Sequence, residues 1–151
     1  MQYRRFGKTN WQLSVFSLGT MRCLTNSQVA EKTIARAIEL GINHLETARG
    51  YGQSEVYLGQ TLKTRLAKPR EEICISTKLS PTPDAKQMSK WIDESLSRLQ
   101  LDYLDCLAIH GINTWQHLDW VSSDRGCFPA IETAMKAGKI RHLGFSCLLY
   151  T

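Results

Sequence analysis

Four ionisable side chains each come directly after an apolar segment of the chain. Glu46 ends INHLE, Tyr51 lies in the loop ARGYG that follows, Lys78 ends ICISTK and His110 ends LDCLAIH. Any one of them alone would most simply mark the polar start of a loop, because ionisable groups are mostly exposed. Four in succession, with types that suit one reaction, predict a shared site.

The chemistry that this set suggests is proton donation to a carbonyl group. A phenol donates to a carbonyl oxygen efficiently only when its pKa, ordinarily about 10, is brought toward the working pH. The ammonium of Lys78 can stabilise the phenolate form of Tyr51, and the carboxylate of Glu46 can hold that ammonium as an ion pair. His110 can orient the carbonyl by donating a hydrogen bond to its oxygen.

The elements that must position these groups alternate along the chain between helical and extended patterns. Apolar residues at helical spacing, with capping residues at the ends, predict helices over 27–40, over 54–66, after Asp84 and after Pro129. Strands are predicted at VFSLGT, INHLETA, EEICISTKL, YLDCLAIH and IRHLGFSC. Before them, Gly7 and Asn10 flank a hairpin turn.

Strict strand–helix alternation implies a parallel sheet covered by helices, which leaves a Rossmann-like sheet and a (β/α)8 barrel as alternatives. A Rossmann fold requires GxGxxG after its first strand, and LGTMRCLTN lacks it. The fold class expected is therefore α/β: a partial (β/α)8 TIM barrel of about five strands and four helices after an N-terminal hairpin. Since a complete barrel needs about 250 residues, we expect residues 1–151 to be the N-terminal portion of a single barrel domain whose C-terminal portion is absent.

Active sites of such barrels lie at the C-terminal ends of the strands, where all four ionisable groups are expected. The segments INHLETARGYG, ISTKL, LAIH and IRHLGFS resemble, in this order and spacing, the aldo-keto reductase family, and YRRFGKTNWQLSVFSLGTM resembles that family's hairpin and first strand. The resemblance implies reduction of small-molecule aldehydes or ketones with NADP(H) and without a metal. It also implies Tyr51 as the proton donor, Lys78 and Glu46 as the groups that tune it, and His110 as the residue that positions the carbonyl.

The same resemblance implies cofactor contacts at Gly19, Thr20, Glu46 and Ser146. Two positions depart from the usual family pattern. Glu46 stands where the family mostly has Asp, which leaves the geometry of its Lys78 pair open, and Cys147 stands where Asn often grips the nicotinamide amide. HLETARGYG, GINT and GKIRHLGFS resemble a bacterial branch whose longer members carry a C-terminal iron–sulfur extension, in which Glu at this position would be ordinary.

Composition excludes several other classes of protein. The net charge is +5, but the 19 Lys and Arg are scattered, which argues against a nucleic-acid partner. The N-terminus is polar and no run of about 18 apolar residues occurs, so we expect neither a signal peptide nor a membrane partner. The five cysteines form no CxxC pair and no spacing typical of a metal site, which favours reduced thiols and a cytoplasmic protein.

Three functional hypotheses remain open at this level. The first is a catalytic carbonyl reductase that uses the four strand-end groups. The second is a non-catalytic fragment or interaction module that self-associates through the exposed edges of its first and fifth strands. The third is a regulatory subunit that keeps the fold and binds cofactor without turnover.

Overall fold

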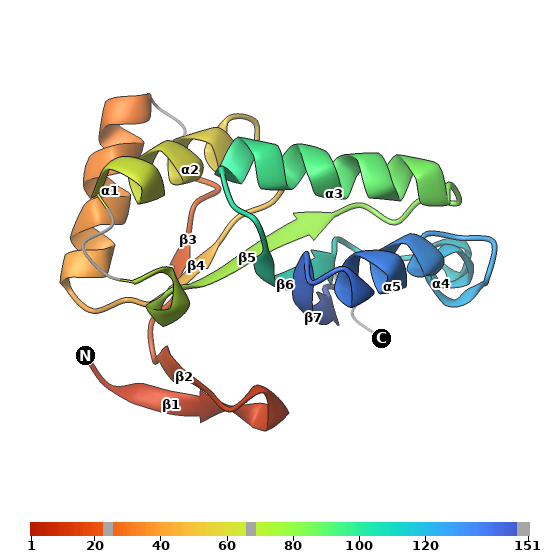
Figure 1. The fold of residues 1–151 in the computed structure, drawn as a ribbon, viewed down its shortest axis with the longest axis horizontal. Helices are drawn as coiled ribbons and strands as arrows, with labels where there is room; N and C mark the ends of the chain where they lie inside the picture. The colour runs from red at the N-terminus through yellow and green to blue at the C-terminus, as the bar shows by residue number, and fades with distance from the viewer. Residues whose placement is uncertain (23–25, 66–68, 148–151) are drawn as a thin grey trace.

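The computed structural model describes residues 1–22, 26–65 and 69–147. It begins with an antiparallel hairpin of β1 (Tyr3–Phe6) and β2 (Trp11–Ser14), joined by the 3-10 turn η1 (Gly7–Thr9). Gly7 and Asn10 adopt φ angles of 52° and 60°, the left-handed conformation that a tight turn of this kind requires. The predicted hairpin is thus confirmed, and in Figure 1 it lies apart from the helices.

A parallel sheet of five strands follows, in the order in which the strands occur along the chain. The strands are β3 (Leu18–Gly19), β4 (His44–Glu46), β5 (Cys74–Leu79), β6 (Leu104–Ile109) and β7 (Ile140–Phe145). A doubly wound sheet would reverse its strand order at a switch point, whereas a (β/α)8 barrel adds each strand beside the last. The fold is therefore the predicted partial TIM barrel. Strands β3 and β7 are its outer strands, and β3 is shorter than the predicted VFSLGT.

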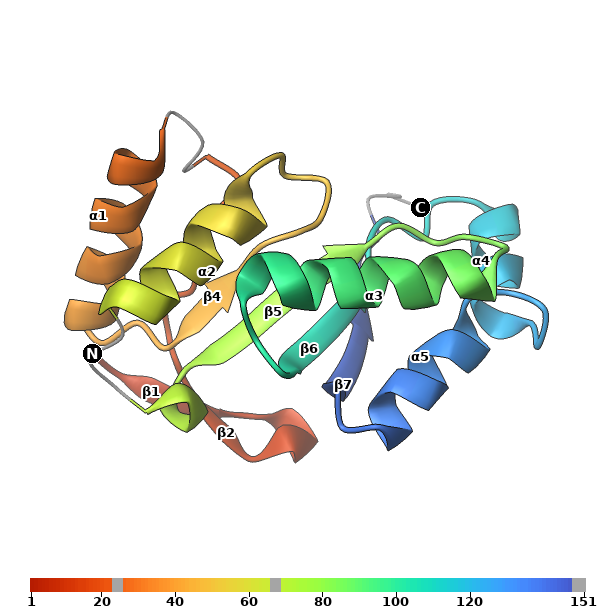
Figure 2. The ribbon, with the colours of Figure 1, turned by 45° about the horizontal axis from the view of Figure 1, so that its top comes forward.

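The described parts of the chain contain five α-helices. They are α1 (Ser27–Glu39), α2 (Ser54–Arg65), α3 (Ala85–Leu99), α4 (Trp115–Ser122) and α5 (Phe128–Lys136), and a short 3-10 turn, η2 (Arg70–Glu72), precedes β5. In Figures 1 and 2, α2, α3 and α5 lie along the strands and α4 lies beyond the strand ends. The four predicted helices are present, except that residue 66 lies outside the described residues. Helix α4 was not predicted, because it buries none of its residues and so has no apolar stripe to reveal it.

Two helix starts follow directly from capping chemistry. The Asn26 side chain accepts a hydrogen bond from the Val29 backbone, and the Asp84 side chain accepts bonds from the first-turn amides of α3. Such caps satisfy amide groups that have no partner within the helix and contribute about 1 kcal/mol each. These two residues fix where α1 and α3 begin, and hence how each helix returns across the sheet.

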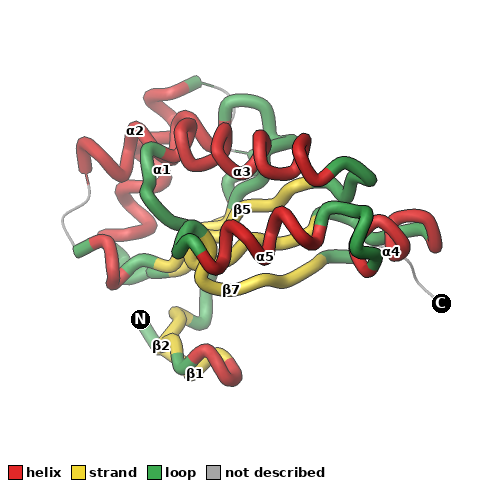
Figure 3. Tube along the Cα trace, turned by 45° about the vertical axis from the view of Figure 1, so that its right-hand side comes forward, coloured by secondary structure: helices red, strands yellow, loops and turns green. Residues whose placement is uncertain are grey.

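The core lies between the helices and the sheet; in the view of Figure 3, α1 to α3 lie above the strands and α5 crosses in front of them. Leu45, Ile75 and Leu107 of the strands and Ile34 and Leu58 of the helices are all completely buried there. Because successive side chains of a strand point to opposite faces, the alternate strand residues face away from the helices. None of the helices in the described parts of the chain is long and apolar enough to cross a membrane.

A buried carboxylate ties together the N-terminal ends of β5, β6 and β7. Asp105 accepts a hydrogen bond from the Ile75 amide at 2.9 Å and forms ion pairs with Arg70 at 2.7 Å and Arg141 at 3.1 Å. Both guanidinium groups also lie over the ring of Tyr103, at 4.3 and 3.8 Å from its centroid. We call these four side chains the Asp105 cluster.

Candidate active site

Strand register places three of the four predicted groups on the same face of the sheet. Glu46 pairs with Ser76 across β4 and β5, and Lys78 pairs with Ala108 across β5 and β6. Lys78 lies two residues after Ser76, and His110 two residues after Ala108, so period-two geometry turns all of them the same way. Glu46, Lys78 and His110 therefore converge on the helix-free face, at the C-terminal ends of the strands.

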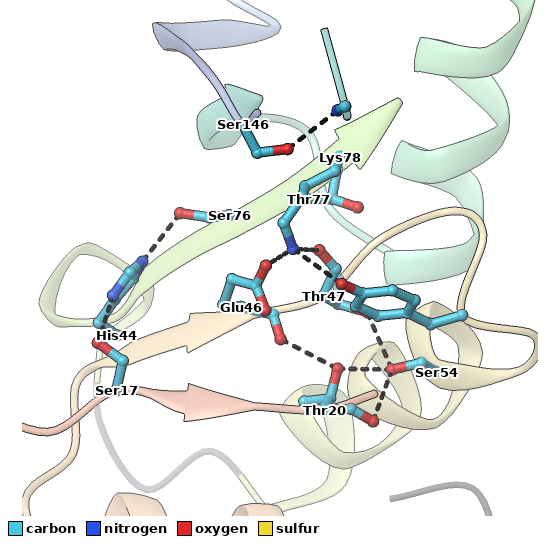
Figure 4. Close-up of polar contacts among 12 residues, drawn as sticks. Ser17, Thr20, His44, Glu46, Thr47, Ser54, Ser76, Thr77, Lys78 and Ser146 are labelled. Atoms are coloured by element: carbon cyan, nitrogen blue, oxygen red, sulfur yellow. Dashed lines mark hydrogen bonds and ion pairs between the residues drawn. The ribbon is translucent and has the colours of Figure 1, made fainter. Parts of the chain in front are cut away.

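Lys78 is the centre of the site. Its Nζ forms an ion pair with the Glu46 carboxylate, donates to the Thr47 carbonyl at 3.1 Å and contacts the Tyr51 hydroxyl at 3.4 Å (Figure 4). The additional methylene of Glu46, compared with the Asp usual in the family, does not prevent the pair. Burial lowers the pKa of Lys78 to about 8, because the charged form loses hydration.

His110 completes the set from the end of β6. Its ring meets the Tyr51 ring edge-on, with the centroids 5.7 Å apart and the planes at 86°. Burial, and then the nearby Lys78 charge, lowers the pKa of His110, so the ring is neutral near pH 7 and one nitrogen carries a proton. Among the described residues nothing hydrogen-bonds to this imidazole, so its N–H is available to a substrate oxygen.

The loop that carries Tyr51 continues β4 along the neighbouring strand before it turns. The Thr47 amide donates to the Ser76 carbonyl at 2.9 Å, and the Arg49 amide donates to the Lys78 carbonyl at 3.0 Å. Lys78 is thus held through its backbone by the same loop that its side chain contacts.

Arg49 anchors the loop from its outer side. Its guanidinium pairs with Glu94 of α3 at 2.7 Å and lies over the Trp91 ring at 4.9 Å. The pairing lowers the pKa of Glu94, chiefly through the hydrogen bond from Arg49. The outer part of the loop is therefore tied to a helix that is itself packed in the core.

The residues expected to contact a cofactor divide into two groups. Gly19, at the end of β3, is exposed and pairs with Glu46; a Cβ at this position would come within 3.7 Å of the Glu46 carboxylate. Thr20 is only 1% exposed, and its hydroxyl contacts that of Ser54 at 2.5 Å and the Glu46 carbonyl at 3.1 Å. The structure places Gly19 at the surface of the site and the Thr20 side chain beneath it.

Ser146 and Cys147 follow β7. The Ser146 hydroxyl accepts a bond from the Gly111 amide at 3.0 Å, in the loop just after His110, and its own donation to the Ile109 carbonyl is long, at 3.5 Å. A hydrogen bond of that length is weak, which leaves the hydroxyl proton available to a ligand. Cys147 is exposed.

Polar residues outside the predicted set also lie around the site; the sequence places His44 on the same strand face as Glu46, whereas Thr47 and Ser54 were not predicted to belong to the site. His44 lies two residues before Glu46 and hydrogen-bonds to the hydroxyls of Ser17 at 2.8 Å and Ser76 at 3.0 Å, and burial is the main cause that lowers its pKa. Thr47 and Ser54 bond to each other at 2.9 Å beneath Tyr51. The Ser54 hydroxyl also contacts that of Thr20, 34 positions away, and no local sequence pattern indicates such a contact.

Residues 16–148 match the Aldo/keto reductase family. The chain belongs to this family. Among curated aldo-keto reductase relatives, it is 34% identical to L-galactose dehydrogenase of Arabidopsis thaliana, over 98% of the chain and 49% of the relative. It is 30% identical to L-glyceraldehyde 3-phosphate reductase of Escherichia coli, over 97% of the chain and 45% of that enzyme. The chain thus spans about half the length of these relatives.

Solved aldo-keto reductases share the arrangement of the elements. The holo form of a Bacillus halodurans enzyme superposes with a TM-score of 0.82 at 28% identity, covering 98% of this chain and 51% of that one. A Bombyx mori enzyme in complex with NADP gives 0.74 at 25% identity, with 96% and 50% coverage. The resemblance to the iron–sulfur branch is not tested by these relatives and stays a prediction.

Proposed function

We propose that this chain supplies the proton-donating half of an NADP(H)-dependent aldo-keto reductase that reduces aldehydes or ketones to alcohols. The observation that carries the proposal is the contact of the Lys78 ammonium with both the Tyr51 hydroxyl and the Glu46 carboxylate. Membership of the family supports oxidoreductase chemistry. The NADP-bound Bombyx mori relative supports the choice of cofactor.

The four groups have distinct parts in such a reaction. His110 donates a hydrogen bond to the substrate oxygen and brings the carbonyl next to Tyr51. As the carbonyl carbon gains a hydride, the Tyr51 hydroxyl transfers its proton to the oxygen, and the product is an alcohol. The Lys78 ammonium stabilises the phenolate left on Tyr51, and Glu46 keeps that ammonium in place.

The residues at the ends of β3, β4 and β7 fit the nicotinamide end of the cofactor. Bound NADP(H) would supply the hydride that adds to the carbonyl carbon. Gly19 presents a surface free of side-chain bulk next to Glu46, and the Ser146 hydroxyl retains a proton for a carboxamide oxygen. We propose these three residues as the cofactor contacts of this chain, with Cys147 adjoining them and Thr20 supporting them from below. The cytoplasmic location expected from the cysteines stays a prediction.

Hydroxyaldehydes are the first substrates to test, because two relatives are named for reactions of sugar carbonyls. Protein produced from the complete gene is mixed with NADPH or NADH and a panel that includes glyceraldehyde and simple aldehydes, and cofactor absorbance is followed. We expect carbonyl-dependent consumption of NADPH with one alcohol formed per cofactor. Cofactor binding without turnover of any carbonyl would contradict the proposal and favour a regulatory subunit.

A further inference from the structure

The loop that carries Tyr51 has to return from β4 to the start of α2, and a single buried hydroxyl holds both of its ends. Ser54, the first residue of α2, is 1% exposed. Its Oγ lies 2.5 Å from the Thr20 hydroxyl, 2.9 Å from the Thr47 hydroxyl and 3.3 Å from the Thr20 carbonyl (Figure 4). One side chain thus joins the end of β3, the end of β4 and the start of α2.

These contacts differ from those of an ordinary helix cap. A capping serine accepts bonds from the amides of the first turn of its own helix. The partners of the Ser54 hydroxyl lie instead on the residues that follow β3 and β4, 34 and 7 positions away. The Ser54 amide also donates to the Tyr51 carbonyl at 3.0 Å, so the residue is bonded directly to the loop segment that bears the phenol.

The same cluster also reaches Lys78. Thr47, which bonds to Ser54 through its hydroxyl, accepts the Lys78 ammonium on its carbonyl at 3.1 Å. The Lys78–Tyr51 contact is 3.4 Å, near the upper limit of a hydrogen bond, where a small displacement removes most of the interaction. Movement of Thr47 or of the loop would therefore alter this contact first.

We propose that Ser54 is a positioning residue: its buried hydroxyl, bridging Thr20 and Thr47, sets the distance between the Tyr51 phenol and the Lys78 ammonium. The inference rests on the proposed function, because it assigns Ser54 a part in proton donation by Tyr51. Ser54 itself lies beneath the site and contacts neither substrate nor cofactor. It is buried, uncharged and within a hydrogen-bonded cluster, so its effect is exerted through the loop.

The chain offers a matched control for removing this hydroxyl. Ser95 of α3 is completely buried, and its hydroxyl has no hydrogen-bond partner among the residues that the structure describes. Ser95→Ala therefore removes the same atom from an equally buried serine without breaking a bond. Thr47→Val is a second test variant, because it removes one partner of Ser54 while keeping the shape of the side chain.

The decisive experiment is a double-mutant cycle between Ser54→Ala and Tyr51→Phe, with kcat and KM measured for NADPH-dependent aldehyde reduction. Misplacement of a reacting group costs up to about 100-fold in rate, so we expect Ser54→Ala to lower kcat by about 10-fold or more with little change in KM. In the Tyr51→Phe background the same substitution should have no further effect, and Ser95→Ala should have none in either. Equal losses of kcat in both backgrounds would overturn the proposal.

Amide hydrogen exchange tests the positioning without turnover and so separates its failure from that of the proposed function. In Ser54→Ala, or in Thr47→Val should the first variant not fold, the amides of Tyr51 and Ser54 should exchange about 10-fold faster or more, because the loop opens locally. The Ile75 amide, in the core of β5, should keep its protection. Unchanged exchange at Tyr51 would overturn the proposal even if the protein proved to be an active reductase, whereas faster exchange in a protein without turnover would leave Ser54 as the anchor and refute only the enzymatic role.

Discussion

The two ends of the parallel sheet each carry ion-paired side chains, but with different cations. At the C-terminal ends of the strands, Lys78 pairs with Glu46 beside Tyr51. At the N-terminal ends, Asp105 pairs with the guanidinium groups of Arg70 and Arg141. Arginine keeps its proton at any physiological pH, whereas burial brings the pKa of Lys78 to about 8. The cation that can lose its proton lies where the proposed reaction would move a proton, and the permanent cations lie where strands are joined.

The carboxylates at the two ends of the sheet also differ in their exposure to solvent. The Asp105 side chain is 3% exposed and that of Glu46 is 27% exposed. The Asp105 carboxylate also accepts a hydrogen bond from the Ile75 backbone amide, so its oxygen atoms are largely occupied by partners within the protein. Groups of the candidate active site, His110 above all, keep donors available for a ligand. The proposed activity therefore concerns the C-terminal ends of the strands, whereas the N-terminal ends are expected to contribute to stability.

Of the substitutions considered, Lys78→Met should have the largest effect on activity without lowering stability. Losing the charge that assists the proton donor should lower kcat/KM by about 10²- to 10⁴-fold, the range typical of general acid–base groups. The free energy of unfolding should stay the same or rise, because a costly desolvated ammonium is removed while the Glu46 carboxylate, 27% exposed, keeps contact with water when its partner is lost. Initial rates and urea unfolding measure the two effects. Lys139→Met is the matched control, since Lys139 forms an exposed pair with Asp93 away from the site; a comparable loss of activity there would break the comparison.

The converse result is expected from Asp105→Asn. Removing the charge leaves two guanidinium groups with a weaker acceptor, and breaking a buried pair in this way costs about 3 kcal/mol of unfolding free energy. The rate per folded molecule should stay within about twofold, because the Asp105 cluster is at the other end of the strands from Tyr51. Asp93→Asn, which breaks an exposed pair, should cost less than about 1 kcal/mol. A similar cost for both substitutions would show that the Asp105 cluster does not hold the strands.

A smaller effect is expected on the pH dependence of kcat/KM, through the protonation of Lys78. Its pKa is lowered from 10.5 to about 8 in the folded protein, so the ammonium that assists Tyr51 is lost as the pH rises through about 8. We expect kcat/KM to fall over that interval, and to fall at lower pH in Glu46→Gln, where the anion that favours the charged form is gone. If kcat/KM of Glu46→Gln fell over the same pH interval as that of the wild-type protein, a group other than Lys78 would be responsible for the fall.

The same shift has a consequence of opposite sign for stability. Between about pH 8 and 10.5 the unfolded chain holds a proton on Lys78 that the folded chain has released. Stability therefore rises with pH in this window relative to Lys78→Met. Urea unfolding of both proteins across the window should show the difference shrinking as the pH increases.

Much of the fold was predictable because its signals are local. Asn26 and Asp84 cap helices within three residues of themselves, and the turn residues Gly7 and Asn10 adopt the positive φ angles that their types favour. The common face of Glu46 and Lys78, by contrast, depends on the register between β4 and β5, which the structure supplies. Helix α4 was missed because hydrophobic periodicity detects only helices that bury one side.

The parts of the site that could not be predicted depend on pairs of residues far apart in sequence. Thr20 was expected to face the cofactor, yet its hydroxyl lies against that of Ser54, 34 residues away. Nothing in the local sequence distinguishes a serine or threonine that is buried in such a cluster from one that faces a ligand. The four ionisable groups could be recognised by residue type. The hydroxyl contacts of Ser54 with Thr20 and Thr47 could be recognised only from the positions of β3, β4 and α2 in the structure.

Substitution of Tyr51 is the most direct test of the proposal that its phenol donates the proton. Tyr51→Phe removes one oxygen atom, and Tyr57→Phe makes the same change at a half-buried tyrosine of α2, outside the site. With NADPH and an aldehyde that the wild-type protein reduces, kcat for Tyr51→Phe should fall by about 10²- to 10⁴-fold. Both variants should keep the unfolding free energy to within about 0.5 kcal/mol. Turnover by Tyr51→Phe at the rate of Tyr57→Phe would contradict Tyr51 as the proton donor.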